Sequence, residues 1–242
     1  IGLVTKRLPG YTGAAPMDIQ VLGALKSGLC GVENLNNRLQ DALNPRVYGK
    51  NEINVGSHLF RVGYKVMQTA NNYELPFVKF GEGAPEQGQG IFNGDIGHIK
   101  TIDRNNGIVE VWYDDNRLAT YGEAEFTDLT AAYAITIHKS QGSEFDVVVI
   151  PLVSGPPTLI NRNLLYTAIT RAKRAVVLVG SKKILAMMVH NNYIAARTTN
   201  LCRFLQSEKV KYLRYFAEGD EAESADGYPE QMPDDIPADE EF

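Results

Sequence analysis

The chain has 242 residues, of which 44% are apolar and 22% charged, and its formal net charge is −5. This length allows one large domain or two small ones, and the composition is ordinary for a globular protein. The sequence has no apolar run of the length that a membrane-spanning helix needs, so we predict no such helix. The first thirty residues lack an uninterrupted apolar segment, so we predict no signal peptide. The two cysteines, Cys30 and Cys202, have no metal-binding spacing and predict a reduced, cytoplasmic setting.

The negative charge is concentrated at the C-terminal end. Residues 219–242 contain ten Asp or Glu residues and no Lys or Arg, so residues 1–218 carry a net charge of +5. A mildly basic body is compatible with nucleic acid as a partner, although the whole chain is acidic. The tail, taken as residues 217–242, has too little apolar surface to offset its ordering entropy and is predicted to be disordered. The sequence does not identify a partner for it.

The first third of the chain predicts a strand, a helix and further strands. Residues 17–28 begin with an apolar strand pattern and end in a polar loop. Within residues 32–45, Leu35, Leu39 and Leu43 recur every fourth position before a proline, which indicates an amphipathic helix. Residues 58–75 favour strands, with a turn at Asn71 and Asn72.

The middle of the chain is rich in strand patterns. We expect a loop over residues 81–90, followed by three short strands. Arg104-Asn105-Asn106-Gly107 and Asp114-Asp115-Asn116 separate these strands and predict hairpin turns. The acidic pair in the second turn also resembles an Mg²⁺-binding strand end, but the hairpin is favoured. Residues 82–128 are therefore predicted to form a small inserted β-barrel.

An α/β pattern returns after residue 128. Residues 134–137, 145–152 and 175–180 are predicted to be buried strands, while residues 161–174, 181–191 and 200–216 are predicted to be helices. Buried strands that alternate with helices indicate a parallel sheet covered on both faces. The predicted fold class is α/β, with residues 1–81 and 129–216 forming the main domain.

Polar residues are concentrated between two of these strands. The stretch AITIHKSQGSEFDVVVIP at residues 134–151 places His138, Lys139, Ser140, Gln141 and Glu144 in one turn. About twenty residues later, LLYTAITRAKRAVVLVG carries Arg171 at the predicted end of a helix. Taken alone, Arg171 could be a surface cation at a helix C-terminus, where positive charge is favoured. The chain contains no complete phosphate-binding loop of the form GxxxxGK followed by Ser or Thr.

Together these two stretches resemble motifs V and VI of superfamily 1 helicases, and the nearest match is the RecD/TraA-like group with 5′→3′ polarity. Residues 18–28 with the following helix resemble the motif IV region, and VGYKVMQTANNYEL with IFNGDIG resembles the next motif. The β-rich segment resembles the SH3-like insertion of the second RecA-like domain in that group. The resemblance covers residues 15–206.

The resemblance implies two sets of site residues. Residues expected at single-stranded DNA are Thr136, His138, Lys139, Ser140 and Asn72. The hydroxyl, imidazole and ammonium donors of the first four are suited to phosphates. Residues expected at the nucleotide are Gly142, Glu144, Arg171 and Lys26, with Arg171 as an arginine finger. No metal ligand is expected in this chain.

The resemblance also implies a missing half. The first RecA-like domain would carry the phosphate-binding loop and the Mg²⁺ ligands, and the chain begins at Ile1 without a methionine. We therefore expect ATP and Mg²⁺ to act in the full-length protein and expect this chain alone to be inactive. Two alternatives remain open: the helicase part of a conjugative relaxase, and a nucleic-acid-binding module without catalysis. A phosphate-binding loop upstream in the parent reading frame would favour a motor over the binding module.

Overall fold

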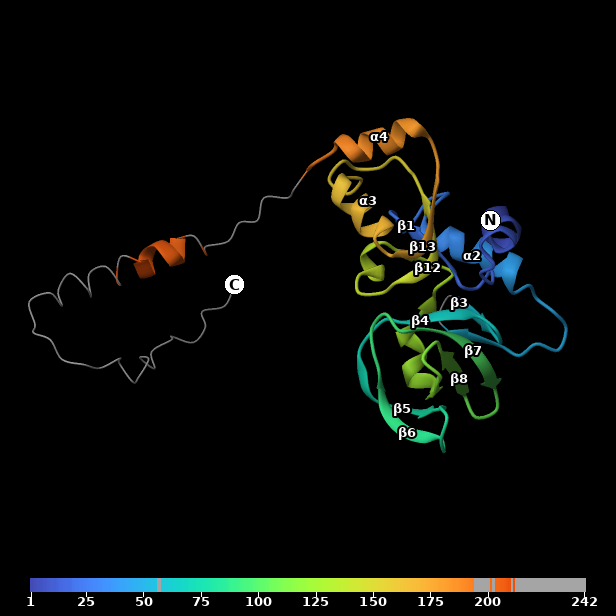
Figure 1. The fold of residues 1–242 in the computed structure, drawn as a ribbon. Helices are drawn as coiled ribbons and strands as arrows, with labels where there is room; N and C mark the ends of the chain where they lie inside the picture. Colours follow the sequence, from blue (N-terminus) through green and yellow to red (C-terminus); the bar gives the residue numbers. More distant parts are fainter. Residues whose placement is uncertain (56–57, 194–200, 202, 210, 212–242) are drawn as a thin grey trace, which may run out of the picture. The chain divides into compact units, whose positions relative to one another are not determined.

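The computed structural model describes residues 1–55, 58–193, 201, 203–209 and 211 (Figure 1). The chain divides into two compact units, residues Ile1–Ile194 and Ala195–Phe242, and the fold below is that of the first. The predicted disordered tail lies outside the described residues. In the predicted helix at 200–216, the described residues are helical. None of the helices in the described ranges is long and apolar enough to cross a membrane.

A parallel sheet of four strands forms the centre of the main domain. Its order is β11 (Ala134–Thr136), β1 (Ile19–Gly23), β12 (Phe145–Pro151) and β13 (Ala172–Val179). All three neighbouring pairs are parallel. The predicted α/β class is therefore confirmed.

Helices cover both faces of this sheet, as predicted (Figure 1). Helix α2 (Val32–Leu43) packs on the face that carries Val21 and Val149. The short N-terminal helices η1 (Leu3–Arg7) and α1 (Leu8–Thr12) contribute to the same core. The opposite face is covered by α3 (Arg162–Ile169) and α4 (Lys182–His190).

An antiparallel sheet of seven strands forms the insertion. Its strands in spatial order are β10 (Leu129–Ala131), β4 (Lys65–Gln68), β7 (Ile96–Asp103), β8 (Ile108–Tyr113), β9 (Arg117–Tyr121), β5 (Asn72–Lys79) and β6 (Glu86–Ile91). The two predicted hairpin turns join β7 to β8 and β8 to β9. This SH3-like sheet is separate from the parallel sheet in its backbone pairing.

The antiparallel sheet extends beyond the segment assigned to it from sequence. Strands β4 and β5 lie before residue 82, and residues 86–90, expected in a loop, belong to β6. The sequence pattern of β4 and β5 indicates strands but does not specify their partners, because pairing depends on residues distant in the chain. The small elements around this sheet are the β2 (Glu52–Val55) and β3 (His58–Arg61) hairpin and the 3₁₀ turn η2 (Glu123–Asp128).

Two further expectations about the main domain are wrong. Arg171 does not lie on a helix, because α3 ends at Ile169 and Arg171 occupies the turn before β13. Strand β13 is not buried throughout: it pairs only with β12 among the described strands, and Val176 and Val179 are partly exposed. An apolar pattern alone does not distinguish an edge strand from a central one.

The two sheets share one hydrophobic core. Phe60, Tyr64 and Tyr133 meet edge to face, with ring centroids 5.2 and 5.3 Å apart. The cluster that contains them joins Val21 and Val147 of the parallel sheet to the interior of the insertion. Packing therefore runs without interruption from one sheet to the other.

A buried lysine lies at this junction. Lys65 of β4 donates a hydrogen bond from Nζ to the Met17 carbonyl oxygen at 2.6 Å, and only 5% of the residue is exposed. Burial lowers the pKa of Lys65 to about 8. Its cross-strand neighbour His98 has a lowered pKa, mainly because of burial and then because of Lys65. Burial also raises the pKa of the nearby Asp114 carboxyl.

This lysine predicts a specific dependence of stability on pH. The ordinary pKa of lysine is 10.5, so between pH 8 and 10.5 the unfolded chain binds more protons at Lys65 than the folded chain. Stability therefore rises with pH in that window. Relative to Lys65→Met, the unaltered chain should gain about 1.5 kcal/mol between pH 8 and pH 9.5. Urea denaturation at both pH values measures the difference, and parallel curves for the two proteins would contradict it.

Candidate functional site

A groove of about 770 Å³ lies at the carboxyl ends of β1 and β11. It brings together Lys26, Thr136 and Lys139, which are far apart in the sequence. Helix α2 forms one side, and Met67 and Thr130 of the insertion also line it. In α/β sheets, ligands bind preferentially outside the carboxyl ends of the strands. The position of this groove makes it the candidate binding site.

The first side of the groove depends on a close approach between β1 and α2. A Cβ atom on Gly23 would lie 2.7 Å from Cγ2 of Val32, so a larger residue would push the helix away. The loop then folds back, and the Lys26 carbonyl accepts a hydrogen bond from the N–H of Glu33 at 3.1 Å. The Lys26 ammonium is exposed, with Nζ 3.8 Å from Oε1 of Glu33. An exposed pair at that distance leaves the ammonium free to exchange partners.

The second side is the turn η3 (His138–Ser140), which follows β11. The Thr136 hydroxyl oxygen accepts a hydrogen bond from the Lys139 N–H at 3.3 Å, which ties β11 to this turn. His138 and Lys139 are exposed. Ser140 is fully buried, and its hydroxyl donates to the Ile137 carbonyl at 2.7 Å. Ser140 was expected to offer a donor at the surface, but its hydroxyl is engaged in the interior.

The residues expected at the nucleotide divide between two places. Lys26 lies in the groove beside Thr136 and Lys139, and Arg171 is not among the residues that line it. Gly142 is exposed with a φ of +89°, which favours glycine. Glu144 is exposed, with an oxygen 3.8 Å from the Lys173 ammonium.

Arg171 connects the two resemblance-bearing stretches of the sequence. Its Nη1 donates to the Ser143 carbonyl at 3.1 Å, and its Nε donates to the Thr167 carbonyl at 3.3 Å. The Arg171 carbonyl in turn accepts from the Phe145 N–H at 2.8 Å. Because Ser143 lies between Gly142 and Glu144, this bond ties Arg171 to the segment that carries both residues. The side chain is half-buried and serves as a local brace in this arrangement.

Asn72 lies apart from the groove. It begins β5 of the insertion, its side-chain oxygen accepts from the Glu74 N–H at 3.1 Å, and it is not among the groove-lining residues. The next residue, Tyr73, is 68% exposed and meets Phe92 edge to face. The structure therefore does not bring Asn72 together with Thr136 and Lys139.

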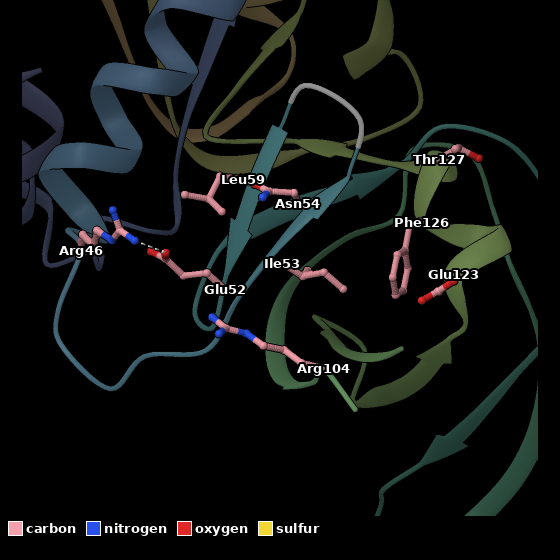
Figure 2. A pocket seen from close by; sticks show the side chains of 9 residues that line it. All are labelled: Arg46, Glu52, Ile53, Asn54, Leu59, Arg104, Glu123, Phe126 and Thr127. Carbon is pink, nitrogen blue, oxygen red and sulfur yellow. Dashed lines mark ion pairs between the residues drawn. The ribbon is translucent and has the colours of Figure 1, made fainter. Parts of the chain in front are cut away.

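A larger cavity, of about 890 Å³, lies between the β2–β3 hairpin and η2 (Figure 2). Figure 2 shows Arg46 and Glu52 facing one another as an ion pair. Nη2 of Arg46 lies 3.2 Å from Oε2 of Glu52. Glu52 also accepts from Arg61 at 2.6 Å, and this hydrogen bond is the main cause of its lowered pKa. None of the sequence-predicted site residues lines this cavity, whereas Lys26, Thr136 and Lys139 line the groove.

Two asparagines are among the groove residues that were missed from the sequence. Asn36 and Asn37 of α2 line the groove, the first buried and the second exposed. The sequence does mark Asn36 as a buried polar residue, because it lies four residues after Val32 and three before Leu39, within the apolar stripe of the helix. Across the described ranges, no three His, Cys, Asp or Glu side chains are grouped to hold a metal ion.

Comparisons with known families match both parts of the chain. Residues 35–113 match the family described as the ATP-dependent RecD-like DNA helicase SH3 domain. Residues 131–179 match the UvrD-like helicase C-terminal domain.

Curated relatives are similar over most of the chain. It is 31% identical over 173 residues to the ATP-dependent RecD2 DNA helicase of Deinococcus radiodurans, covering 72% of this chain and 21% of that protein. It is 32% identical over 191 residues to the RecBCD enzyme subunit RecD of Mycolicibacterium smegmatis, covering 79% of this chain and 30% of that protein. The chain thus spans less than a third of the length of these relatives.

The crystal structure of Bacteroides Pif1 bound to ssDNA is 18% identical, with a TM-score of 0.42, and the match covers 80% of this chain and 46% of that one.

The bracing contacts of Arg171 predict a local effect of its removal. In Arg171→Ala, the Ser143 carbonyl loses its guanidinium donor, so the turn at residues 138–143 should open more often. Amide exchange at Ser143, whose N–H donates to the Ser140 carbonyl, should become at least about tenfold faster, since one hydrogen bond to a charged group contributes about 1.5–3 kcal/mol. Lys173→Ala is the control, because its pair with Glu144 is exposed and weak. Equal exchange in both variants would contradict the brace.

Proposed function

Because this chain is the C-terminal region of a RecD-like superfamily 1 helicase, with an SH3 domain insertion and a UvrD-like C-terminal domain, we propose that it supplies the second motor half of an ATP-dependent 5′→3′ DNA helicase. The ATP site would be completed by another RecA-like domain. In this proposal the chain contributes the contacts to single-stranded DNA and one side of the ATP cleft.

The observation that carries the proposal is the groove at the carboxyl ends of β1 and β11. Two lysines, Lys26 and Lys139, and the hydroxyl of Thr136 line it from different elements. Ammonium groups that line one groove from different elements are suited to a phosphate backbone that passes along it. The net charge of +5 on residues 1–218 supports the same partner. We therefore assign Lys26 to DNA, with Thr136, Lys139 and the exposed His138, and not to the nucleotide.

The nucleotide role is proposed for the cluster around Ser143. Gly142 and Glu144 flank that residue, and Arg171 bonds to its carbonyl. A guanidinium held just beyond the end of a helix can be presented to a partner domain, where it would stabilise charge on the transferring γ-phosphoryl group. Release of its bonds to Ser143 and Thr167 would free the guanidinium donors for that contact. Mg²⁺ and the phosphate-binding loop belong to the partner domain in this proposal, so the isolated chain should not hydrolyse ATP.

The DNA assignment predicts a change in salt dependence. Each lost lysine–phosphate contact should lower the slope of log K against log salt by about 0.7 for single strands. We expect this decrease for Lys26→Ala and for Lys139→Ala, measured by fluorescence anisotropy with a labelled oligo-dT. Lys183→Ala is the matched control, because this exposed lysine of α4 does not line the groove. If all three variants keep the slope of the unaltered chain, the groove does not bind DNA.

The arginine-finger role predicts a selective loss of turnover. In the full-length protein, Arg171→Ala should reduce ATPase kcat at saturating DNA by about 10³-fold or more. Arg171→Lys should recover little, since an ammonium cannot reproduce a planar fork of donors. Arg174→Ala is the control, because Arg174 is an exposed cation three residues away and pairs with Asp146 at 3.5 Å. Near-normal turnover in Arg171→Ala, or DNA-stimulated turnover by the isolated chain, would refute this part of the proposal.

A further inference from the structure

Residues 131–134 form the connection between the two sheets. Strand β10 of the insertion ends at Ala131, and β11 of the parallel sheet begins at Ala134. Ala131, Ala132, Tyr133 and Ala134 are all buried, so water cannot satisfy their backbone groups.

Two buried side-chain amides bond to this connection. Asn36 of α2 accepts from the Ala134 N–H at 2.8 Å and donates to the Ala134 carbonyl at 2.8 Å. It also donates to the Ala131 carbonyl at 3.4 Å. Gln20 of β1, which is fully buried, donates to the Ala132 carbonyl at 3.1 Å. We call Gln20 and Asn36 the amide clamp.

Asn36 takes the place of a neighbouring strand. On the inner side of β11, the Tyr133 carbonyl and the Ile137 N–H bond to β1. The N–H and carbonyl of Ala134 point the opposite way, where β11 has no strand partner among the described residues. The amide of Asn36 satisfies both groups from α2, as a paired backbone would.

We infer that the amide clamp positions the groove: Asn36 and Gln20 fix the connection so that Thr136 and Lys139 stay in the same groove as Lys26. The inference rests on the proposed function, because it names residues that act on DNA through others. Asn36 is 5% exposed and its polar atoms are engaged, so it is a positioning residue and not a DNA contact. Through Ala131, the clamp also couples the insertion to the groove.

The test uses a charge change at neighbouring asparagines. Asn36→Asp turns a carboxylate oxygen toward the carbonyls of Ala134 and Ala131, which repel it until the carboxyl is protonated. Asn37→Asp is the matched control: Asn37 also lines the groove but is exposed, so its carboxylate stays charged at pH 6. Asn36→Leu removes all three hydrogen bonds of the Asn36 amide at every pH.

We expect Asn36→Asp to bind oligo-dT about tenfold more weakly than Asn37→Asp at pH 8, each relative to the unaltered chain. At pH 6 most of this difference should disappear, because burial raises the pKa of the new carboxyl and its protonated form can donate to Ala134. Asn36→Leu should stay weak at both pH values. Identical behaviour of Asn36→Asp and Asn37→Asp at both pH values would overturn the inference.

Amide exchange separates this inference from the proposed function. In Asn36→Leu, exchange should become faster at Ala134, which loses its acceptor, and at Lys139, whose N–H bonds to Thr136. The matched control is Asn37→Ala, which should leave both amides protected because Asn37 is exposed. If the unaltered chain does not bind oligo-dT, the proposed function fails, and the clamp is then judged by exchange at Lys139. Unchanged exchange at Lys139 in Asn36→Leu would overturn the clamp even if DNA binding is confirmed.

Discussion

The arrangement of this chain depends on how the buried backbone between its two sheets is hydrogen-bonded. A segment that leaves an antiparallel sheet and enters a parallel one keeps only part of each pairing: the Ala132 N–H still donates to the Lys65 carbonyl, and the Tyr133 carbonyl accepts from the Val21 N–H. The backbone groups that these bonds do not reach would be costly if they were left free in the interior. Side-chain amides from β1 and α2 satisfy the backbone at Ala131, Ala132 and Ala134. These bonds act together with the parallel pairing of β11 to β1, which carries one side of the groove.

The sequence predicts the local elements of the main domain well, because their signals are local. The period of Leu35, Leu39 and Leu43 is sufficient for α2, and the continuous apolar run at residues 147–150 is sufficient for β12. The strands with which each element pairs are harder to predict from the sequence. Nothing in the pattern of β4 assigns it to the insertion, because its partners β7 and β10 lie about thirty and sixty residues further along the chain.

In the candidate site, too, the features that depend on neighbouring residues were predicted better than those that depend on residues distant in the chain. Lys139 and Thr136 lie close to one another in sequence, and both reach the groove. Ser140 belongs to the same polar run but turns inward, since a 3₁₀ turn places successive side chains on different sides. Lys26 was grouped with the nucleotide because of its place in a resemblance, whereas its place in the groove depends on how closely α2 approaches β1. That approach is set by Gly23, whose role is visible only in three dimensions.

The shared core has a consequence for how such an insertion can be gained or lost. Tyr64 of the connection before β4 and Tyr133 at the end of the insertion pack against each other, and the same cluster continues to Val147. Excising the insertion would therefore expose the large apolar side chains that it covers on the main domain. An insertion that shares its core with the main domain cannot be transferred to another protein as an independent domain. We therefore expect substitutions on the two sides of the junction to have been selected together.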